Sequence, residues 1–428
     1  MSQKCNNDRL PPAAVTSMPA MQTVDLANRM SRLGTETAFE VLARARALEA
    51  TGRSVVHLEI GEPGFDTPPN VVDAAVKALR EGHTHYVQSA GIPEARAAIA
   101  DVFTATRGVQ ADPDQVVITP GAKPIMFFAI LALVGQGDEV VLPDPSFPIY
   151  RSMVEFAGGT AVPYVLPIDD GYRLDPAHLE ELITPRTKLV IINSPGNPTG
   201  STLPRADLER IAEVIMRHPG CMVLTDEVYR GLSFLDEPPA SIAEVDGMME
   251  RTIVLDGLSK TYAMTGWRAG WGIMPPAIRP AIERLVVNSV SCTAAFIQYA
   301  LIEALLGDQS AALGMREELR ARRDRFVPRL QAVPGFRCLM PTGAFYAYAS
   351  VADTGMDGDT VAARLLDEVG IACLGGSGFG DSGRDFVRFS FGGASEELAD
   401  VPDRITAWLL KASPSGADAS LGDASAAN

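Results

Sequence analysis

Lys260 lies where a lysine side chain could act as a nucleophile. It follows the apolar run TIVLD (252–256), inside the stretch DGLSKTYAMTGWRAGW (256–271). Burial at the end of a strand lowers the pKa of a lysine, and the neutral amine can form a Schiff base with an aldehyde. For Lys260 taken alone, an ordinary surface lysine with a packed stem is the better interpretation. Arg268 suits a phosphate or a carboxylate, and its alternative is an ordinary salt bridge.

Asp226 ends a second apolar run, CMVLTD (221–226). An unpaired carboxylate at the end of a buried strand is costly, so it needs a cationic or protonated partner. A protonated ring nitrogen is one such partner, and a role as the N-cap of the next helix is the alternative. We expect Tyr229, three residues later, to lie on the same side of a helical turn as Asp226.

The turn TPGAK (119–123) precedes an apolar helix and could hold a phosphate group. Gly121 lets the backbone approach a ligand, and free N–H groups at a helix start, here near Ala122 and Lys123, bind anions. The turn does not fit the G-x-x-x-x-G-K-[ST] pattern of a Walker A loop, and alone it is a weak signal. A lysine, an aspartate, a phosphate-binding turn and an arginine together form the set of groups that binds pyridoxal phosphate.

Short apolar runs must position these groups. They are VVIT (116–119), EVVLP (139–143), KLVIIN (188–193), CMVLTD (221–226) and TIVLD (252–256). Because they are apolar throughout, they are typical of strands buried on both faces of a parallel sheet that helices cover. Four of them end in the polar loops PGAK, NSPGNPTG, DEVY and GLSK. Since ligands bind beyond the carboxyl ends of such strands, the sequence predicts an α/β fold with one polar rim.

The pattern changes after about residue 305. Residues 310–331 predict a charged amphipathic helix, and the segments GAFYAYASV (343–351) and DFVRFSFG (385–392) alternate. Alternation predicts a smaller, antiparallel sheet with one face in solvent.

We therefore expect two domains. The large one, 62–305, has a mostly parallel sheet sandwiched by helices, and a smaller α+β domain is formed by 25–61 with 306–410. Residues 1–24, as an N-terminal arm, and 411–428, as a tail, are expected to be disordered because they are rich in small and polar residues and proline.

Composition limits the function classes. The net charge of −16 argues against binding to nucleic acid or to an anionic membrane surface. The five scattered cysteines form no C-x-x-C pair, which favours free thiols in a reducing compartment. No signal peptide is recognisable, and the longest apolar run, 125–134, is too short to span a bilayer. We expect a cytoplasmic protein without a metal site.

Six motifs in this order resemble the class I aminotransferases, which are fold type I pyridoxal-phosphate enzymes, and in particular the bacterial-type aspartate aminotransferases. The motifs are EIGEPGFDTP, HYVQSAGIPEARAAIA, NSPGNPTG, TDEVY, SKTYAMTGWRAGW and VRFSFG, and the match covers about residues 25–410. The resemblance implies pyridoxal 5'-phosphate as cofactor, an amino acid and a 2-oxo acid as substrates, and a homodimer with shared active sites.

The resemblance also implies roles for residues that match the motifs. Lys260 would hold the cofactor and move the substrate's proton, Asp226 would pair with the ring nitrogen, and Arg388 would bind the substrate α-carboxylate. Asn197 and Tyr229 would contact the phenolic oxygen of the ring, and Phe147 would stack on the ring. The residues implied around the phosphate are Gly121, Ala122, Lys123, Ser259 and Arg268, with Tyr86 at the phosphate of the neighbouring subunit. Gly61 and Asn197 would lie near the substrate. Gly257 departs from the family pattern, because many members have a phosphate-binding serine there.

Several alternatives stay open at this stage. The pattern G-x-G-x-x-G occurs at Gly378, Gly380 and Gly383, but a nicotinamide site needs a helix there, and the following residues indicate a strand. The same cofactor and fold also support β-lyases and decarboxylases. A cofactor-sensing transcription regulator would carry a DNA-binding domain in front of the match, where this sequence has only about 25 residues.

The substrate prediction rests on one lysine. Lys123 matches a lysine associated with the distal carboxylate of acidic substrates, which favours aspartate with 2-oxoglutarate. A lysine that merely helps to bind phosphate at a helix start is the alternative. Phe39 and Phe147 would also tolerate aromatic or other neutral amino acids.

Overall fold

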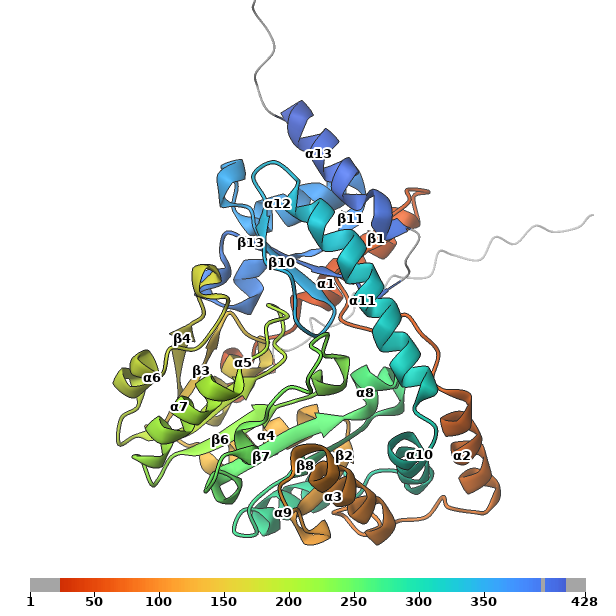
Figure 1. Cartoon of the computed structure of the whole chain (residues 1–428), viewed down its shortest axis with the longest axis vertical. Coiled ribbons are helices and arrows are strands. Elements are labelled where there is room, and N and C mark those ends of the chain that lie inside the picture. Colours follow the sequence, from red (N-terminus) through yellow and green to blue (C-terminus); the bar gives the residue numbers. More distant parts are fainter. Residues whose placement is uncertain (1–23, 394–396, 413–428) are drawn as a thin grey trace, which may run out of the picture.

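The computed structural model describes residues 24–393 and 397–412 of the 428-residue chain. The predicted disorder of the two terminal segments falls almost entirely on residues outside these ranges. A large sheet occupies the lower part of the molecule in Figure 1, and a smaller sheet with the helices α11 (Ser310–Gln331), α12 (Gly358–Arg364) and α13 (Val401–Ala412) occupies the upper part.

The large sheet has seven strands in the order β2-β8-β7-β6-β5-β3-β4. From β4 to β7 all neighbours are parallel, and β8 runs antiparallel to β7 and to β2. The strands are β2 (Val116–Pro120), β3 (Glu139–Asp144), β4 (Thr160–Val165), β5 (Thr187–Asn193), β6 (Met222–Asp226), β7 (Thr252–Gly257) and β8 (Ala269–Ile273). The predicted α/β fold with a mostly parallel sheet is confirmed, and each of the predicted runs forms a strand.

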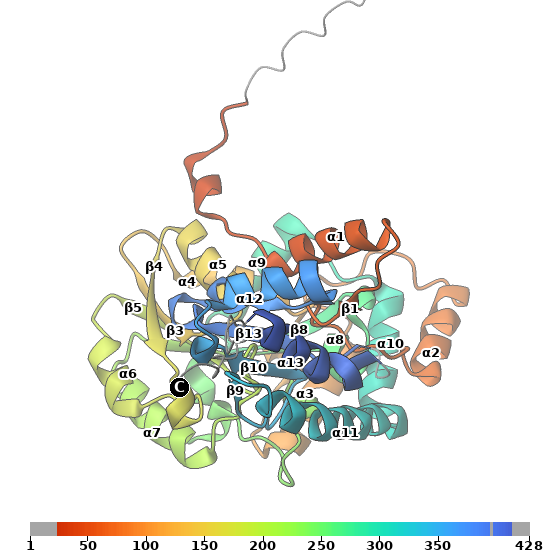
Figure 2. The ribbon, with the colours of Figure 1, turned by 90° about the horizontal axis from the view of Figure 1, so that it is seen from above.

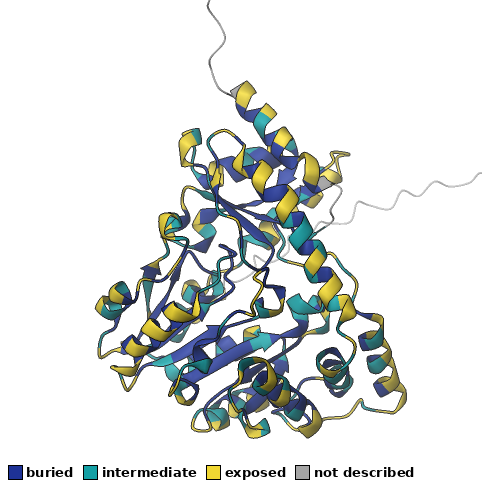
Figure 3. Cartoon of the chain, in the orientation of Figure 1, coloured by how far each residue is buried: buried dark blue, intermediate teal, exposed yellow. Residues whose placement is uncertain are grey.

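Helices bury both faces of this sheet. In β5, Leu189 and Ile191 join a core with three helices, whereas Val190 and Ile192 join a core with two others. The first face is covered by α4 (Lys123–Leu133), α5 (Ile149–Ala157) and α9 (Arg279–Ser289), and the second by α6 (Pro176–Leu182) and α7 (Arg205–Met216). The strands accordingly appear as buried in Figure 3, which explains why their sequences are apolar throughout.

A third core closes the β2–β8 end of the sheet. It is formed with α2 (Pro69–Arg80), α3 (Pro93–Arg107) and α10 (Ala295–Leu306). Figure 1 shows these helices around the lower end of the molecule. In the described part of the chain, no helix combines the length and the apolar character that crossing a membrane requires.

Two strands of the large sheet, β4 and β8, are not predicted by the pattern of short apolar runs. β4 lies at an edge and contains Pro163, and β8 contains Gly270 and Gly272. Proline and glycine both weaken a strand prediction. The glycines are required by packing: a Cβ at Gly270 would lie 2.2 Å from the backbone nitrogen of Ala122, and one at Gly272 would lie 2.7 Å from Ile125.

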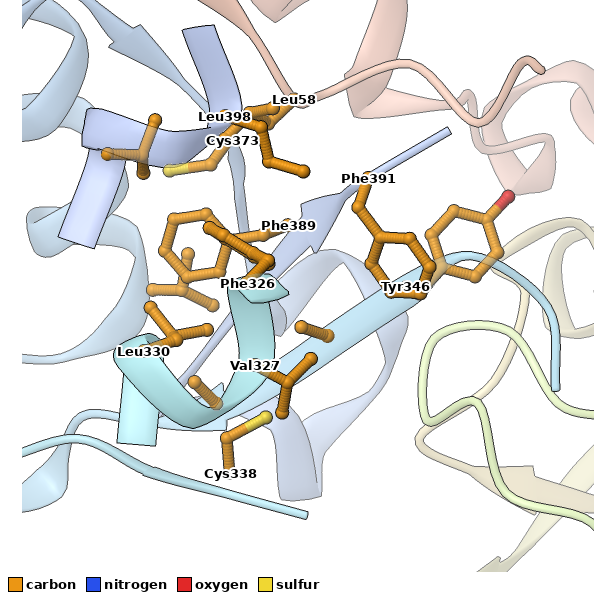
Figure 4. Packing of buried hydrophobic residues seen from close by; sticks show 14 of the residues in the cluster. Leu58, Phe326, Val327, Leu330, Cys338, Tyr346, Cys373, Phe389, Phe391 and Leu398 are labelled. Carbon is orange, nitrogen blue, oxygen red and sulfur yellow. The ribbon is translucent and has the colours of Figure 1, made fainter. Parts of the chain in front are cut away.

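The smaller sheet has four antiparallel strands in the order β12-β13-β10-β9. They are β9 (Arg337–Cys338), β10 (Tyr346–Ser350), β12 (Leu374–Gly375) and β13 (Phe386–Ser390). Figure 4 shows its core, in which Phe326, Val327 and Leu330 of α11 pack against Phe389 of β13. β1 (Val56–His57) pairs in parallel with β11 (Ile371–Ala372), and α1 (Thr37–Glu49) packs on β11 and β12, so the N-terminal segment joins this unit, as Figure 2 shows from above.

The prediction that one face of the smaller sheet lies in solvent is wrong. Ala347 and Val387 point into the core with α11, and on the other face Tyr348 is buried with Phe379. Arg388, which breaks the apolar pattern on that second face, is only 4% exposed. The alternation in β13 therefore separates a hydrophobic core from a buried polar site, not from solvent.

Candidate active site

A cavity of about 480 Å³ lies at the carboxyl ends of the large sheet's strands and extends to β13 and α1. It brings together most of the residues that the sequence singled out: Gly61, Ala122, Lys123, Phe147, Asn197, Asp226, Tyr229, Gly257, Ser259, Lys260, Arg268 and Arg388. The polar loops that follow four separate strands therefore do meet at one rim. Neither Gly121 nor Tyr86 lines the cavity, but Gly121 is adjacent to Ala122 in the chain and packs against Arg268, which both do.

Asp226 is a buried carboxylate without a cationic partner among the described residues. The Tyr150 hydroxyl donates a hydrogen bond of 2.6 Å to Oδ2, and the Val228 N–H donates one of 3.3 Å to Oδ1. Burial raises the pKa of Asp226 to about 6, although the bond from Tyr150 opposes this shift. A cation arriving from the cavity would relieve this cost, so the residue fits the protonated ring nitrogen of pyridoxal phosphate.

Tyr229 follows Asp226 in a turn and not in the expected helical turn, although both side chains line the cavity. Its hydroxyl lies 2.7 Å from the Tyr346 hydroxyl, and both phenols are buried. Asn197 is also buried, and its Oδ1 accepts a hydrogen bond from Arg388. These side chains link the end of the large sheet to the smaller sheet.

Lys260 lies in the one-turn helix α8 (Leu258–Thr261), directly after β7. Its Nζ donates a hydrogen bond of 2.5 Å to the carbonyl oxygen of Gly61. Burial, together with the charge of Arg388, lowers the pKa of Lys260 to about 8. The amine is thus neutral far more often than that of a surface lysine, as a Schiff-base lysine requires.

The turn before α4 forms a cup that could hold a phosphate. Gly121 has a φ of 89°, and a Cβ there would lie 2.2 Å from the Arg268 guanidinium. Arg268 itself has a φ of 55°, a conformation that is costly for arginine and that places its exposed guanidinium against this turn. The start of α4, Ser259 and Arg268 together suit an anion.

Gly257 has a packing reason of its own. A Cβ at this position would lie 3.0 Å from the carbonyl oxygen of Ala269 and 3.1 Å from Gly270 Cα. A serine would therefore require β8 to move by a few tenths of an ångström. The absence of a side chain at Gly257 therefore lets β7 pack against the backbone of Ala269 and Gly270 in β8.

Arg388 presents a guanidinium from β13 to the cavity. Nη1 donates to Asn197 Oδ1 at 3.0 Å, and Nη2 donates to the carbonyl oxygen of Glu59 at 2.6 Å. The rings of Tyr346 and Phe379 lie 4.5 and 4.9 Å from Cζ. Nε is buried without a hydrogen-bond partner among the described residues. A carboxylate arriving from the cavity would supply an acceptor to this fork.

Sequence reasoning missed several polar residues that line the site, and three of them contact predicted site residues through their side chains. Tyr150 holds Asp226, Tyr346 bonds Tyr229, and Glu36 lines the cavity in an ion pair with Lys123. A signal exists only for Tyr150, which follows Phe147 by three residues in DPSFPIY and so by about one helical turn. The other two contacts join distant segments, which no spacing reveals.

We expect Tyr150→Phe to weaken the binding of pyridoxal phosphate by about 10- to 100-fold. The phenylalanine keeps the ring and its edge contact with Phe147 but removes the donor that stabilises the charged form of Asp226. Hydrogen bonds to charged groups contribute about 1.5–3 kcal/mol. Titrating the apoprotein with the cofactor while monitoring visible absorbance gives the dissociation constant.

Tyr164→Phe is the matched control for this change. Tyr164 is also buried, but its hydroxyl donates a hydrogen bond of 2.9 Å to the neutral carbonyl oxygen of Ile191 and does not line the active-site cavity. Its cofactor affinity should stay within about 3-fold of the unaltered protein. Equal losses in the two variants would mean that Tyr150 acts through general stability only.

The nicotinamide alternative lacks the geometry that it needs. The segments Gly376–Phe379 and Asp381–Gly383 form short 3-10 turns, and β13 follows them. No α-helix begins at these glycines, so no helix N-terminus is available to bind a dinucleotide pyrophosphate there.

Comparison with known proteins gives consistent results. Residues 53–405 match the family model of aminotransferase class I and II. The chain is 38% identical to an aspartate/prephenate aminotransferase of Cereibacter sphaeroides over 394 residues, which cover 90% of this chain and 98% of that protein. It is 38% identical to aromatic-amino-acid aminotransferase 2 of Thermococcus litoralis over 354 residues, covering 82% of this chain and 90% of that protein. Among solved structures, aspartate aminotransferase from Thermus thermophilus with maleate aligns with a TM-score of 0.86 at 34% identity, covering 90% of this chain and 99% of that one.

Proposed function

Since the chain belongs to the class I and II aminotransferases and is thus a pyridoxal-phosphate-dependent enzyme, we propose that it transfers the amino group of aspartate to 2-oxoglutarate. One observation carries the choice of substrate. Besides Lys260 and Arg268, the cavity is lined by two further cations, Arg388 and Lys123. A dicarboxylic amino acid offers one carboxylate to each of them.

Our proposal assigns the cofactor contacts to the cavity walls. Asp226 would pair with the ring nitrogen, Asn197 and Tyr229 would contact the phenolic oxygen, and Phe147 would lie against the ring. The phosphate would lie in the cup formed by Gly121, Ala122, Lys123, Ser259 and Arg268. The unpaired carboxylate of Asp226 and the glycine that admits Arg268 support this orientation.

When bound, pyridoxal phosphate supplies an electron sink for the electron pair left as the substrate Cα loses its proton. Lys260 Nζ is the base that we propose for this proton, and its pKa of about 8 means that half of the amine is neutral near pH 8. Asp226 would keep the opposite end of the site anionic, with Tyr150 holding the carboxylate in place. Gly61, whose carbonyl oxygen accepts from Lys260, would lie beside the substrate.

Arg388 would fix the substrate through its α-carboxylate, and Lys123 would reach a distal carboxylate. The phenyl rings of Phe39 and Phe147 also line the cavity, which supports aromatic amino acids as a second group of donors. The aromatic relative from Thermococcus litoralis supports the same alternative.

The proposed enzyme uses both predicted domains and two subunits. Lys260 and Asp226 lie within 62–305, whereas Arg388 lies within 306–410, so closure of the smaller domain would complete the substrate site. Tyr86 is 88% exposed, which supports its proposed contact with the phosphate of a second subunit in a homodimer. We also propose a cytoplasmic location, which is supported by four free cysteines among the described residues: Cys221, Cys292, Cys338 and Cys373.

The test is a panel of amino donors with purified holoenzyme and 2-oxoglutarate, in which glutamate formation is measured. We expect aspartate to have the highest kcat/KM and aromatic donors to follow. A strong preference for alanine or phenylalanine over aspartate would contradict the aspartate assignment. Release of pyruvate and ammonia from an amino acid alone would instead indicate a β-lyase.

A further inference from the structure

We propose that Glu36 determines substrate specificity by occupying Lys123, so that the distal carboxylate of a dicarboxylic substrate must displace Glu36 before Lys123 can bind it. This inference rests on the proposed function and refines it. Lys123 is then not a free cation that awaits an acidic substrate. The preference for aspartate over neutral donors depends on the competition between two carboxylates for one ammonium group.

The geometry places the ion pair inside the cavity. Glu36 Oε1 accepts a hydrogen bond from Lys123 Nζ, and both residues line the same cavity as Lys260 and Arg388. Lys123 Nζ also lies 5.3 Å from the centre of the Phe147 ring. A substrate side chain that reaches the part of the cavity beside Phe147 therefore meets an ammonium group that already has a carboxylate.

Glu36 is held in a way that allows it to leave. It directly precedes α1, but its side chain makes no capping hydrogen bond, and within the described part of the chain Lys123 is the one polar partner of that side chain. The segment before it, 24–35, is exposed throughout. Releasing Glu36 thus breaks one ion pair and disturbs no core packing.

Charge makes the competition selective. Burial lowers the pKa of Lys260 and of Arg388, and the negative charge of Glu36 opposes part of this shift from its place in the same cavity. A second carboxylate next to Lys123 competes with Glu36 for the ammonium group, whereas an aromatic or aliphatic side chain has no charge with which to compete. The partial exposure of both partners screens this competition, with 20% of the Glu36 and 47% of the Lys123 side chain exposed.

The test compares Glu36→Gln with the unaltered holoenzyme in the half-reaction with donor alone, because 2-oxoglutarate is itself a dicarboxylate. The ratio of rate constants for aspartate over phenylalanine should rise by about 5-fold. In binding titrations, the affinity for maleate should rise by a similar factor, while that for 3-phenylpropionate stays within about 2-fold. Glu40→Gln, on the exposed surface of α1, is the matched control and should change neither ratio.

A second variant separates competition from general charge effects. In a Lys123→Gln background, Glu36→Gln should no longer raise the aspartate ratio by more than about 2-fold, because there is no ammonium group left to release. An unchanged or lower ratio in Glu36→Gln alone, or an equal rise without Lys123, would overturn the inference. A holoenzyme that transaminates no donor at all would contradict the proposed function, and the maleate titrations would still test the role of Glu36.

Discussion

Replacing Lys260 by alanine is expected to lower kcat by at least about 10⁴-fold, because the variant loses both the group that holds the cofactor and the proposed base. The visible absorption band of the lysine-bound cofactor should disappear at the same time. Stability should not fall, since a cation held in this cavity is costly and its pKa is already lowered to about 8. Thermal unfolding of the apoprotein, together with absorbance and single-turnover rates, measures all three effects.

Two further variants sharpen this expectation. Lys260→Arg keeps a positive charge but cannot hold the aldehyde, so it should lose activity and colour like the alanine variant. Lys77→Ala removes an exposed lysine of α2 and should leave both unchanged. Full activity in Lys260→Arg would show that charge alone suffices at this position and would contradict the proposed role.

Much of this site could be predicted because strand ends are a local feature. Asp226 ends an apolar run, and Lys260 and Lys123 each follow another run after a short turn. Parallel strands bring their carboxyl ends to one edge, so separate short patterns predicted residues that line one cavity. No knowledge of long-range packing was needed for these residues.

The remaining features depend on contacts that sequence spacing does not encode. Glu36 reaches Lys123 across 87 positions, and Tyr346 reaches Tyr229 across 117. β8 was not predicted because it contains glycines, which have a low strand propensity. These glycines are required by the close approach of α4. The sequence predicted that one face of the smaller sheet lies in solvent, because a buried functional arginine and an exposed arginine give the same alternating pattern.

Arg388→Lys is expected to lower kcat/KM for every amino acid by about 10²- to 10⁴-fold. Lysine keeps the charge but cannot offer two parallel N–H donors to a carboxylate. Each charge-assisted bond contributes about 1.5–3 kcal/mol, so the loss of two corresponds to this range. The substitution also leaves Asn197 Oδ1 and the Glu59 carbonyl oxygen without their present donor, so circular dichroism and cofactor absorbance must accompany the kinetics.

The decisive comparison uses a donor that lacks the α-carboxylate. The unaltered enzyme should prefer phenylalanine to 2-phenylethylamine, and Arg388→Lys should remove most of this preference, because the two donors differ only in the group that Arg388 is proposed to bind. Arg384→Lys, an exposed change just before β13, should keep the preference intact. If Arg388→Lys slows both donors equally, the arginine acts by holding Asn197 and the backbone of Glu59 in place, and the carboxylate must be bound elsewhere.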